Sequence, residues 1–260
     1  GKEGVAVNYV ERIAGKATSL ALLGVQPPDH FPLLFYRDDP ADIHLTVEHA
    51  KALPLAGLPA VQLSGNAFSR GTCAEAAWFI TQAAAGTDTR QFLDLDLRPT
   101  DWAEPADFGR SMRRLLPLVD VAIGTEEELA GAFLDAARPL AQPTTPAEVE
   151  QLDQMVAESV ARDDGAIVVK RGILGASVFD SSGRLDVAGF PADVINTVGA
   201  GDSFAGGLIR SRLLGLDWEE AIRFANACGA IQVGRHGCSA AFPTTPEVEA
   251  FMKEHEAPRG

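Results

Sequence analysis

The stretch from Asn196 to Phe204 carries the residues best suited to chemistry, in the order Asn-Thr-Val-Gly-Ala-Gly-Asp-Ser-Phe. Gly199 and Gly201 flank the small Ala200, so the backbone can turn tightly and point several N–H groups at one place. A helix that begins there adds the positive end of its dipole, which suits an anion, most plausibly a phosphate. Asp202 would repel that anion, so we expect it to act as a general base that takes a proton from an attacking hydroxyl.

Two other interpretations of the glycine pair stay open. The pair can form a tight strand-to-helix turn with no ligand, or it can begin a dinucleotide-binding G-x-G-x-x-G fingerprint. Phe204 stands where the third glycine of that fingerprint belongs, and only residues 205–260 follow it. A dinucleotide fold needs more sheet than that after its first strand, so the second interpretation is weak.

Composition narrows the class of protein. The chain has 260 residues, 46% of them hydrophobic, which fits one large α/β domain with or without a small appendage. Its net charge of −14 argues against DNA or RNA as a partner, because a nucleic-acid backbone needs a basic face. The three cysteines form no spaced pair, which predicts a reduced, cytoplasmic location. No apolar run approaches the roughly 20 residues of a membrane span, so we expect no membrane partner.

Strands and helices alternate from residue 55 onward. This rhythm predicts an α/β fold whose mostly parallel sheet is covered on both faces and binds ligands at the carboxyl ends of its strands. An earlier hairpin is expected to stand apart as a small sheet. The expected strands are 17–24, 31–37, 59–63, 91–97, 119–124, 166–170, 176–180 and 185–190; the expected helices are 72–85, one from 125, 147–162, 202–214, 217–233 and one from 246.

The stretch Asn196–Phe204 closely resembles D-T-x-G-A-G-D-x-F, the C-terminal signature of the ribokinase-like (pfkB) carbohydrate kinases. The resemblance implies a three-layer ribokinase-like sandwich with a small β lid, and it implies ATP and Mg²⁺ as cofactors. It makes Asp202 the catalytic base and makes the amides of Gly199, Ala200 and Gly201 the anion hole for the transferred phosphoryl group. Thr197 of the same signature becomes a nucleotide-site residue.

Two further segments belong to the nucleotide site if the resemblance holds. Lys170, Gly172 and Gly175 match the family's K-x-G-x-x-G, which contacts the nucleotide phosphates and sugar; otherwise they form a glycine turn into a hairpin. Asn226 and Gly229 lie where the family builds its adenine pocket. The alternative for that helix is close packing through small residues, with its cysteine as a core residue.

Glu128 stands three residues after Thr125, the spacing of a capping box at a helix start. The family has N-x-x-E here, which implies that Glu128 lies in the magnesium and phosphate environment, although Thr125 replaces the asparagine. Both interpretations can hold at once.

Arg98 and Arg37 are the candidate substrate residues. Arg98 ends Asp94-Leu95-Asp96-Leu97-Arg98-Pro99, which as a strand would place both carboxylates on one face. The family's acid-sugar kinases carry a comparable segment whose arginine lies near the substrate, but an internal ion pair fits equally well. Arg37 follows the hairpin strand and could meet an acidic or polar substrate from the lid.

Within the family, the chain is most similar to the 5-dehydro-2-deoxygluconokinases of inositol breakdown. That similarity implies ATP-dependent phosphorylation of a primary hydroxyl of 5-dehydro-2-deoxygluconate. A 2-keto-3-deoxygluconate kinase, or another sugar kinase of the family, is the near alternative. A non-catalytic sugar- or nucleotide-binding regulator on the same fold is the alternative of another class.

The resemblance also sets the expected organisation. Residues 1–40 become part of the β lid and its connections, with a homodimer through the lid as a possible assembly, and residues 41–260 become the kinase core. The family's N-terminal segment, with a G-G motif and a sugar-binding aspartate, is expected to be absent. Asn196 replaces the aspartate that helps relatives bind a monovalent cation, so dependence on such a cation is left open.

Overall fold

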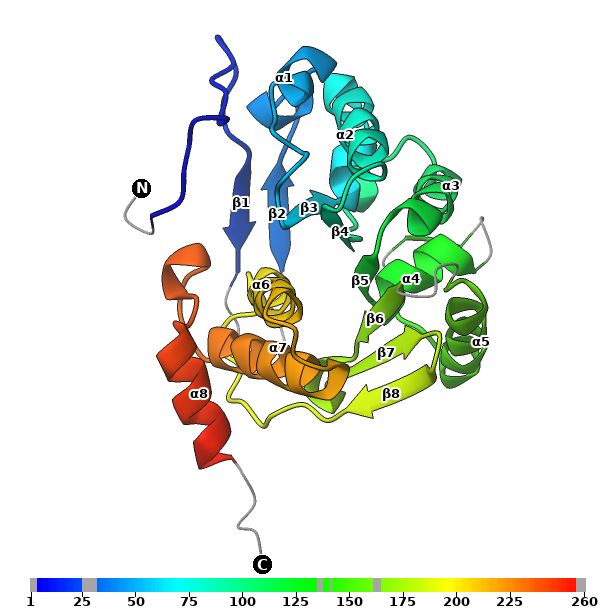
Figure 1. Cartoon of the computed structure of the whole chain (residues 1–260), viewed down its shortest axis with the longest axis vertical. Helices are drawn as coiled ribbons and strands as arrows, with labels where there is room; N and C mark the ends of the chain where they lie inside the picture. Colours follow the sequence, from blue (N-terminus) through cyan, green and yellow to red (C-terminus); the bar gives the residue numbers. More distant parts are fainter. Residues whose placement is uncertain (1–3, 25–31, 135–137, 141, 161–164, 256–260) are drawn as a thin grey trace, which may run out of the picture. The chain divides into compact units, whose positions relative to one another are not determined.

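The computed structural model describes the chain except for residues 1–3, 25–31, 135–137, 141, 161–164 and 256–260 (Figure 1). Its larger sheet has the strand order β3-β4-β5-β6-β7-β8, and its smaller sheet consists of β1 and β2. The chain divides into two compact units, one of Gly1–Leu20 with Phe35–Ala166 and one of Ala21–Leu34 with Ile167–Gly260. This is the α/β class that the sequence predicts.

The first unit contains three parallel strands followed in the chain by helices. Leu63 of β3 lies opposite Leu93 of β4, and Phe92 of β4 lies opposite Val121 of β5. The elements are β3 (Ala60–Ser64), β4 (Arg90–Asp94), β5 (Val121–Thr125), α1 (Val47–Lys51), α2 (Gly71–Ala84), α3 (Pro105–Leu115), α4 (Glu126–Phe133) and α5 (Pro146–Glu158), with short 3₁₀ helices at Ala41–His44, Gly65–Phe68, Pro99–Asp101 and Leu116–Leu118.

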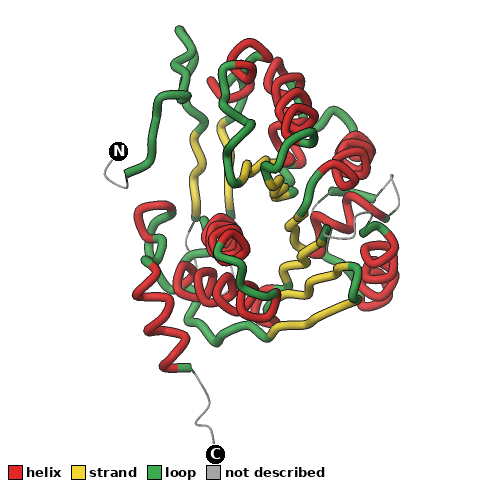
Figure 2. Tube along the Cα trace, in the orientation of Figure 1, coloured by secondary structure: helices red, strands yellow, loops and turns green. Residues whose placement is uncertain are grey.

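The buried apolar side chains of this unit come from the strands and from α2, α3 and α4. The sequence prediction missed α3, which starts with Pro105 at its first turn and has Glu104 and Asp107 as a capping box. Phe108, Met112 and Leu115 share one face of α3 at helical spacing and are fully buried. Figure 2 shows α4 lying beside β5, and the two elements contact each other.

The second unit contains an antiparallel set of strands and the last three helices. Val168 of β6 lies opposite Val178 of β7, which lies opposite Leu185 of β8. The elements are β6 (Ala166–Lys170), β7 (Ala176–Asp180), β8 (Gly183–Val187), α6 (Ala200–Leu213), α7 (Trp218–Val233) and α8 (Thr245–Glu254), with 3₁₀ turns at Gly172–Leu174 and Ser239–Ala241.

Helices α6 and α7 pack side by side (Figure 1). A Cβ built on Gly207 of α6 would lie 2.7 Å from Sγ of Cys228 on α7, so the two backbones approach closely because Gly207 has no side chain. Burial raises the pKa of the Cys228 thiol to about 12, which keeps it protonated. Cys228 is therefore a packing residue, as its small neighbours suggested.

The expected lid hairpin is present as β1 (Leu20–Leu23) and β2 (Leu33–Tyr36), joined by the backbone hydrogen bond from Gly24 N to Pro32 O of 2.8 Å. Residues 25–31, which connect the two strands, lie outside the described residues. None of the described helices is long and apolar enough to cross a bilayer.

Candidate active site

The candidate phosphate site is the start of α6 in the second unit. Gly199 stands immediately before the helix with φ +82°, a left-handed conformation that glycine adopts without strain. No side chain caps this helix, and the first turn of a helix leaves its backbone N–H groups without intrahelical partners. The N–H groups of Gly201 and Asp202 are therefore available to an anion. Of the three amides expected to form the anion hole, that of Ala200 already donates to Thr197 O (3.3 Å).

Lys170 brings a positive charge to the same turn. A Cβ built on Gly201 would lie 3.4 Å from Nζ of Lys170, so the ammonium group lies beside the start of α6. Lys170 ends the buried strand β6, which fixes its position within the unit. An ammonium group next to unpaired helix N–H groups is a suitable environment for a phosphate.

Asp202 lies in the first turn of α6 and is exposed. Its carboxylate makes no hydrogen bond or ion pair with the residues that the structure describes. A carboxylate without a hydrogen-bond partner among these residues can accept a proton from a hydroxyl placed beside it, which is the requirement for a general base.

The remaining predicted nucleotide residues also lie in this unit, in different settings. Gly172 (φ +57°) and Gly175 (φ +98°) form the turn between β6 and β7, and a Cβ on Gly175 would come within 2.1 Å of Val187 O. Thr197 is exposed, and Gly229 has room for a neighbour, since its built Cβ comes no closer than 3.7 Å to Ala200 O.

Asn226 has a structural role. Its side chain is buried, and Nδ2 donates to Val187 O (3.2 Å) and Ala188 O (3.1 Å). The amide thus ties α7 to the end of β8, and its donor group faces the protein backbone.

A monovalent cation does not fit the turn around Asn196. Nδ2 of Asn196 donates to Gly237 O (2.6 Å), and Nε2 of Gln232 donates to Gly237 O (3.0 Å) and Val198 O (3.1 Å). The carbonyl of Gly237 thereby accepts two hydrogen bonds, which occupies both of its lone pairs. Cations of this kind need free oxygen atoms, and here amide N–H groups occupy them, so we derive no step through a monovalent cation.

In the first unit, the candidate substrate residue Arg98 follows the carboxyl end of β4. The predicted strand 91–97 ends earlier, at Asp94, and Asp94 itself is buried. Asp96 therefore lies outside the strand, and the two carboxylates do not share a strand face. Asp96 pairs with Arg98 (Oδ1 to NH2, 2.6 Å), the internal ion pair that the sequence left as an alternative.

Glu128 forms the capping box expected at the start of α4. Its Oε2 accepts from Thr125 N (2.7 Å) and its Oε1 accepts from Leu97 N (3.0 Å). Thr125 Oγ1 accepts from Glu128 N in return (3.2 Å). Glu128 thus joins the end of β4 to the end of β5, and both carboxylate oxygens hold backbone N–H groups.

Arg37 lies in an ion-pair network that the sequence did not reveal. Its guanidinium donates to Asp101 (2.9 Å), Asp42 (2.6 Å) and Ser19 (2.7 Å). Burial tends to lower the pKa of Arg37, but hydrogen bonds to Asp42 and Asp101 outweigh it and raise that pKa. Asp101 is almost fully buried and also binds Arg70 at 3.2 Å. Partners 31 to 64 residues apart leave no local pattern, so Asp101 and Arg70 could not be found from spacing.

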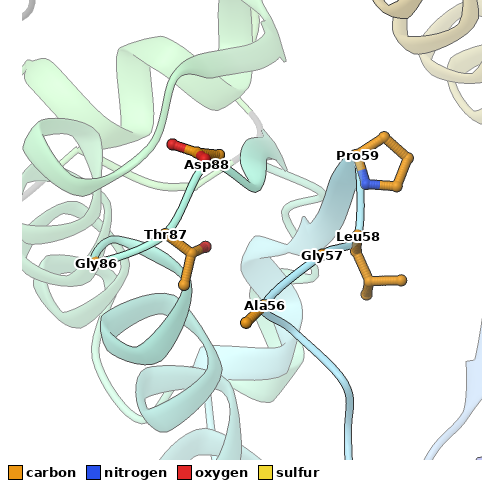
Figure 3. A pocket seen from close by; sticks show the side chains of 7 residues that line it. All are labelled: Ala56, Gly57, Leu58, Pro59, Gly86, Thr87 and Asp88. Carbon is orange, nitrogen blue, oxygen red and sulfur yellow. The ribbon is translucent and has the colours of Figure 1, made fainter.

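A cavity of about 490 Å³ lies at the opposite edge of the same unit. Figure 3 shows its lining, which comes from the two loops that lead into β3 and β4 and consists of Ala56, Gly57, Leu58, Pro59, Gly86, Thr87 and Asp88. Since parallel α/β sheets bind ligands at the carboxyl ends of their strands, this cavity lies at the wrong edge for the candidate site.

Comparison with known proteins shows which family the chain resembles. Residues 1–245 match the pfkB family carbohydrate kinase model. A 5-dehydro-2-deoxygluconokinase 2 of Bacillus cereus (strain ZK / E33L) is 30% identical over 241 residues, covering 92% of this chain and 70% of that protein.

Two solved structures have a similar fold. An aminoimidazole riboside kinase from Salmonella enterica, in complex with aminoimidazole riboside and an ATP analogue, has a TM-score of 0.75 at 20% identity, over 96% of this chain and 78% of that one. An E. coli protein described as a ribokinase II, in complex with ATP and Mg²⁺, has a TM-score of 0.73 at 23% identity, and the match covers 92% of this chain and 72% of that one. The chain belongs to the pfkB family of carbohydrate kinases and is an ATP-dependent sugar kinase.

Proposed function

We propose that the chain transfers the γ-phosphoryl group of ATP to a primary hydroxyl of 5-dehydro-2-deoxygluconate, a small acidic keto sugar of inositol catabolism. The observation that carries the choice of substrate is the 30% identity to kinases named for it, over more than nine-tenths of the chain. Arg98 supports an acidic substrate, because its guanidinium keeps N–H donors that none of the described residues uses.

In the proposed reaction, a carboxylate oxygen of Asp202 takes the proton of the sugar hydroxyl. The new O–P bond forms as the bond between the γ-phosphorus and its bridging oxygen breaks, and ADP leaves. The N–H groups of Gly199 and Gly201 are proposed to hold the charge that develops on the phosphoryl oxygens, and Lys170 adds its positive charge beside Gly201. The amide of Ala200 can join them only if it gives up its hydrogen bond to Thr197 O.

The second unit is proposed to hold the nucleotide. Gly172, with open space around its Cβ position, is proposed to let the phosphates and sugar approach the backbone, whereas Gly175 shapes the same turn by packing against the end of β8. Thr197 and Gly229 are proposed to contact the nucleotide. Asn226 contributes by fixing α7 to the end of β8.

Mg²⁺ would neutralise the phosphate charge of bound ATP. Magnesium sites of this kind usually take one or two carboxylates beside the phosphates, and Glu128 stays the proposed residue of the magnesium environment. Its two oxygens already hold backbone N–H groups, so direct coordination would have to replace them.

The first unit is proposed to supply the sugar side through Arg98. A direct role for Arg37 requires it to exchange Asp42, Asp101 or Ser19 for the substrate. Residues 1–40 are proposed as part of the lid and 41–260 as the kinase core. The cytoplasmic location stays a prediction, and it agrees with the three free thiols at Cys73, Cys228 and Cys238.

A panel of sugars tests the proposal. Phosphorylation is followed by ADP release with ATP and Mg²⁺, using 5-dehydro-2-deoxygluconate, 2-keto-3-deoxygluconate and neutral ketoses. We expect the highest kcat/KM for 5-dehydro-2-deoxygluconate. A higher kcat/KM for 2-keto-3-deoxygluconate would make that sugar the substrate instead. Binding of sugar or ATP without any turnover would show that the protein is a non-catalytic regulator.

A further inference from the structure

Asp96 has a backbone conformation that side-chain-bearing residues rarely adopt. Its φ is +38°, the single positive value outside glycine among the residues that the structure describes. Aspartate tolerates this left-handed region better than most residues, but the conformation still carries strain. Strained backbone persists where neighbouring contacts hold it, and it often occurs at functional sites.

The carboxylate of Asp96 is held from two sides. Oδ2 accepts a hydrogen bond from Ser64 Oγ at the end of β3 (2.7 Å), and Oδ1 pairs with NH2 of Arg98 (2.6 Å). The backbone N–H of Asp96 donates to Oδ1 of Asp94, the last residue of β4 (3.2 Å). The left-handed turn therefore places this carboxylate between two adjacent strand ends.

Arg98 is held in place but keeps donors to spare. Its guanidinium carbon lies 5.0 Å from the ring centroid of Phe35 on β2, and NH1 donates to Leu97 O (3.3 Å). The side chain is 34% exposed. A guanidinium has five N–H donors, and among the residues that the structure describes the contacts to Asp96 and Leu97 use two of them. The others can bind a planar, negatively charged group such as a carboxylate.

We propose that Asp96 is a positioning residue that presents Arg98 to the carboxylate of an acidic sugar. Asp96 fixes one edge of the guanidinium, Phe35 covers one face, and the remaining edge binds the substrate's carboxylate. Asp96 itself does not touch the sugar. This inference rests on the proposed function, because it requires a substrate that carries a carboxylate.

Three substitutions of Asp96 separate conformation, contact and charge. Asp96→Asn keeps acceptor and donor atoms for Arg98 and Ser64 and tolerates the left-handed backbone. Asp96→Gly relieves the strain but removes both contacts. Asp96→Ala removes the contacts and keeps the strain. Ser64→Ala loosens the carboxylate without altering Asp96, and Asp88→Ala, an exposed aspartate at the opposite strand edge, serves as the control.

The experiment measures the melting temperature of each variant, and KM and kcat for 5-dehydro-2-deoxygluconate and for its uncharged methyl ester. We expect Asp96→Gly and Asp96→Ala to raise KM for the acid about tenfold, with kcat changed less than about threefold, because they lose the side-chain contact that orients Arg98. For Asp96→Asn, KM for the acid should stay within about threefold of the wild-type value, and for Ser64→Ala it should lie between those of Asp96→Asn and Asp96→Ala. KM for the ester should not change in any of these variants. The glycine variant should melt at a higher temperature than the alanine variant, the reverse of the usual order.

An unchanged KM for the acid in both Asp96→Gly and Asp96→Ala overturns the positioning role, and a lower melting temperature for glycine than for alanine contradicts the left-handed conformation. If either variant fails to fold, Ser64→Ala decides, and an unchanged KM in that variant also overturns the proposal. A wild-type protein that phosphorylates neutral sugars but no sugar acid refutes the proposed substrate and this inference together. That outcome is visible before any variant is made.

Discussion

Gly199 occupies the most restricted backbone position of the candidate phosphate site. Its φ of +82° disfavours any side chain, and a built Cβ would come to 2.9 Å from both Sγ of Cys238 and Cε1 of Phe242. The glycine is therefore needed for two independent reasons, conformation and space. The sequence predicted the turn correctly, but the crowding by Cys238 and Phe242 depends on residues about 40 positions away.

We expect Gly199→Ala to lower the free energy of unfolding by at least about 2 kcal/mol, since the left-handed conformation and the close contacts both oppose a methyl group. Gly206→Ala is the matched control, because Gly206 lies on α6 with open space around its Cβ position. Alanine there should be neutral or stabilise the helix by up to about 1 kcal/mol. Urea unfolding of both variants measures this, and equal stabilities would contradict the assigned geometry.

The helices and strands follow the sequence closely where a local pattern defines them. Capping boxes mark the starts of α4, α5, α7 and α8, and the expected helices begin at or near those residues. The helix α3 has the same kind of local signal, in Pro105 and in the spacing of Phe108, Met112 and Leu115. It could have been predicted from the sequence but was missed. The end of β4 at Asp94 could not be predicted from the sequence, because the left-handed turn at Asp96 depends on contacts with Ser64 and Arg98.

The capping box of α8 makes the stability of the folded protein depend on pH. Hydrogen bonds from the backbone N–H and hydroxyl of Thr244, and then the contact with Arg235, lower the pKa of Glu247 from 4.5 to about 2. A lowered pKa in the folded state means that the stabilisation is complete above the ordinary pKa and is lost as pH falls toward 2.

Glu247→Gln should therefore be less stable than the wild type at neutral pH, with the difference shrinking between about pH 4.5 and pH 2. Thermal unfolding of both proteins across this range measures it. Glu249→Gln, an exposed glutamate on the same helix, should show no such pH-dependent difference. A difference that stays constant with pH would contradict the assigned hydrogen bonds.

The turn held by Asn196 and Gln232 predicts independence from monovalent cations. Replacing K⁺ with tetramethylammonium at equal ionic strength should change the rate less than about twofold and leave the melting temperature unchanged, since amide donors already occupy the carbonyls. Asn196→Asp removes the donor to Gly237 and should destabilise the protein by about 1–3 kcal/mol, a loss that K⁺ partly restores. Strong activation and stabilisation of the wild type by K⁺ would refute this account.

For the whole molecule, the family and α/β class follow from sequence, whereas the ion pairs that join distant segments do not. Arg37, Arg70 and Asp101 meet only after the chain has folded, so no spacing rule could pair them. Similarly, the sequence did not show that both oxygens of Glu128 would hold backbone N–H groups. The candidate phosphate site was more predictable because its residues are contiguous, from Asn196 to Asp202.

The proposed homodimer through the lid is a prediction for the whole molecule. Leu20 and Leu22 alternate along β1, and Leu34 and Tyr36 along β2, and all four side chains are about half exposed. Exposed apolar side chains on a two-stranded sheet favour association. Sedimentation should show a dimer for the wild type and a monomer for Leu22→Glu, whereas Leu214→Glu, an equally exposed leucine at the end of α6, should remain a dimer. A wild-type monomer at every concentration would contradict the prediction.

The most direct test of the catalytic account is the kcat of Asp202→Asn with ATP, Mg²⁺ and the best sugar of the panel. Because Asp202 is exposed and unpaired among the described residues, its replacement should change the melting temperature little, and loss of its negative charge should not weaken ATP binding. We expect kcat to fall about a thousandfold, the contribution of a positioned general base. Asp193→Asn, an exposed aspartate with no assigned role, should turn over like the wild type. Undiminished turnover in Asp202→Asn would contradict the assignment of the base.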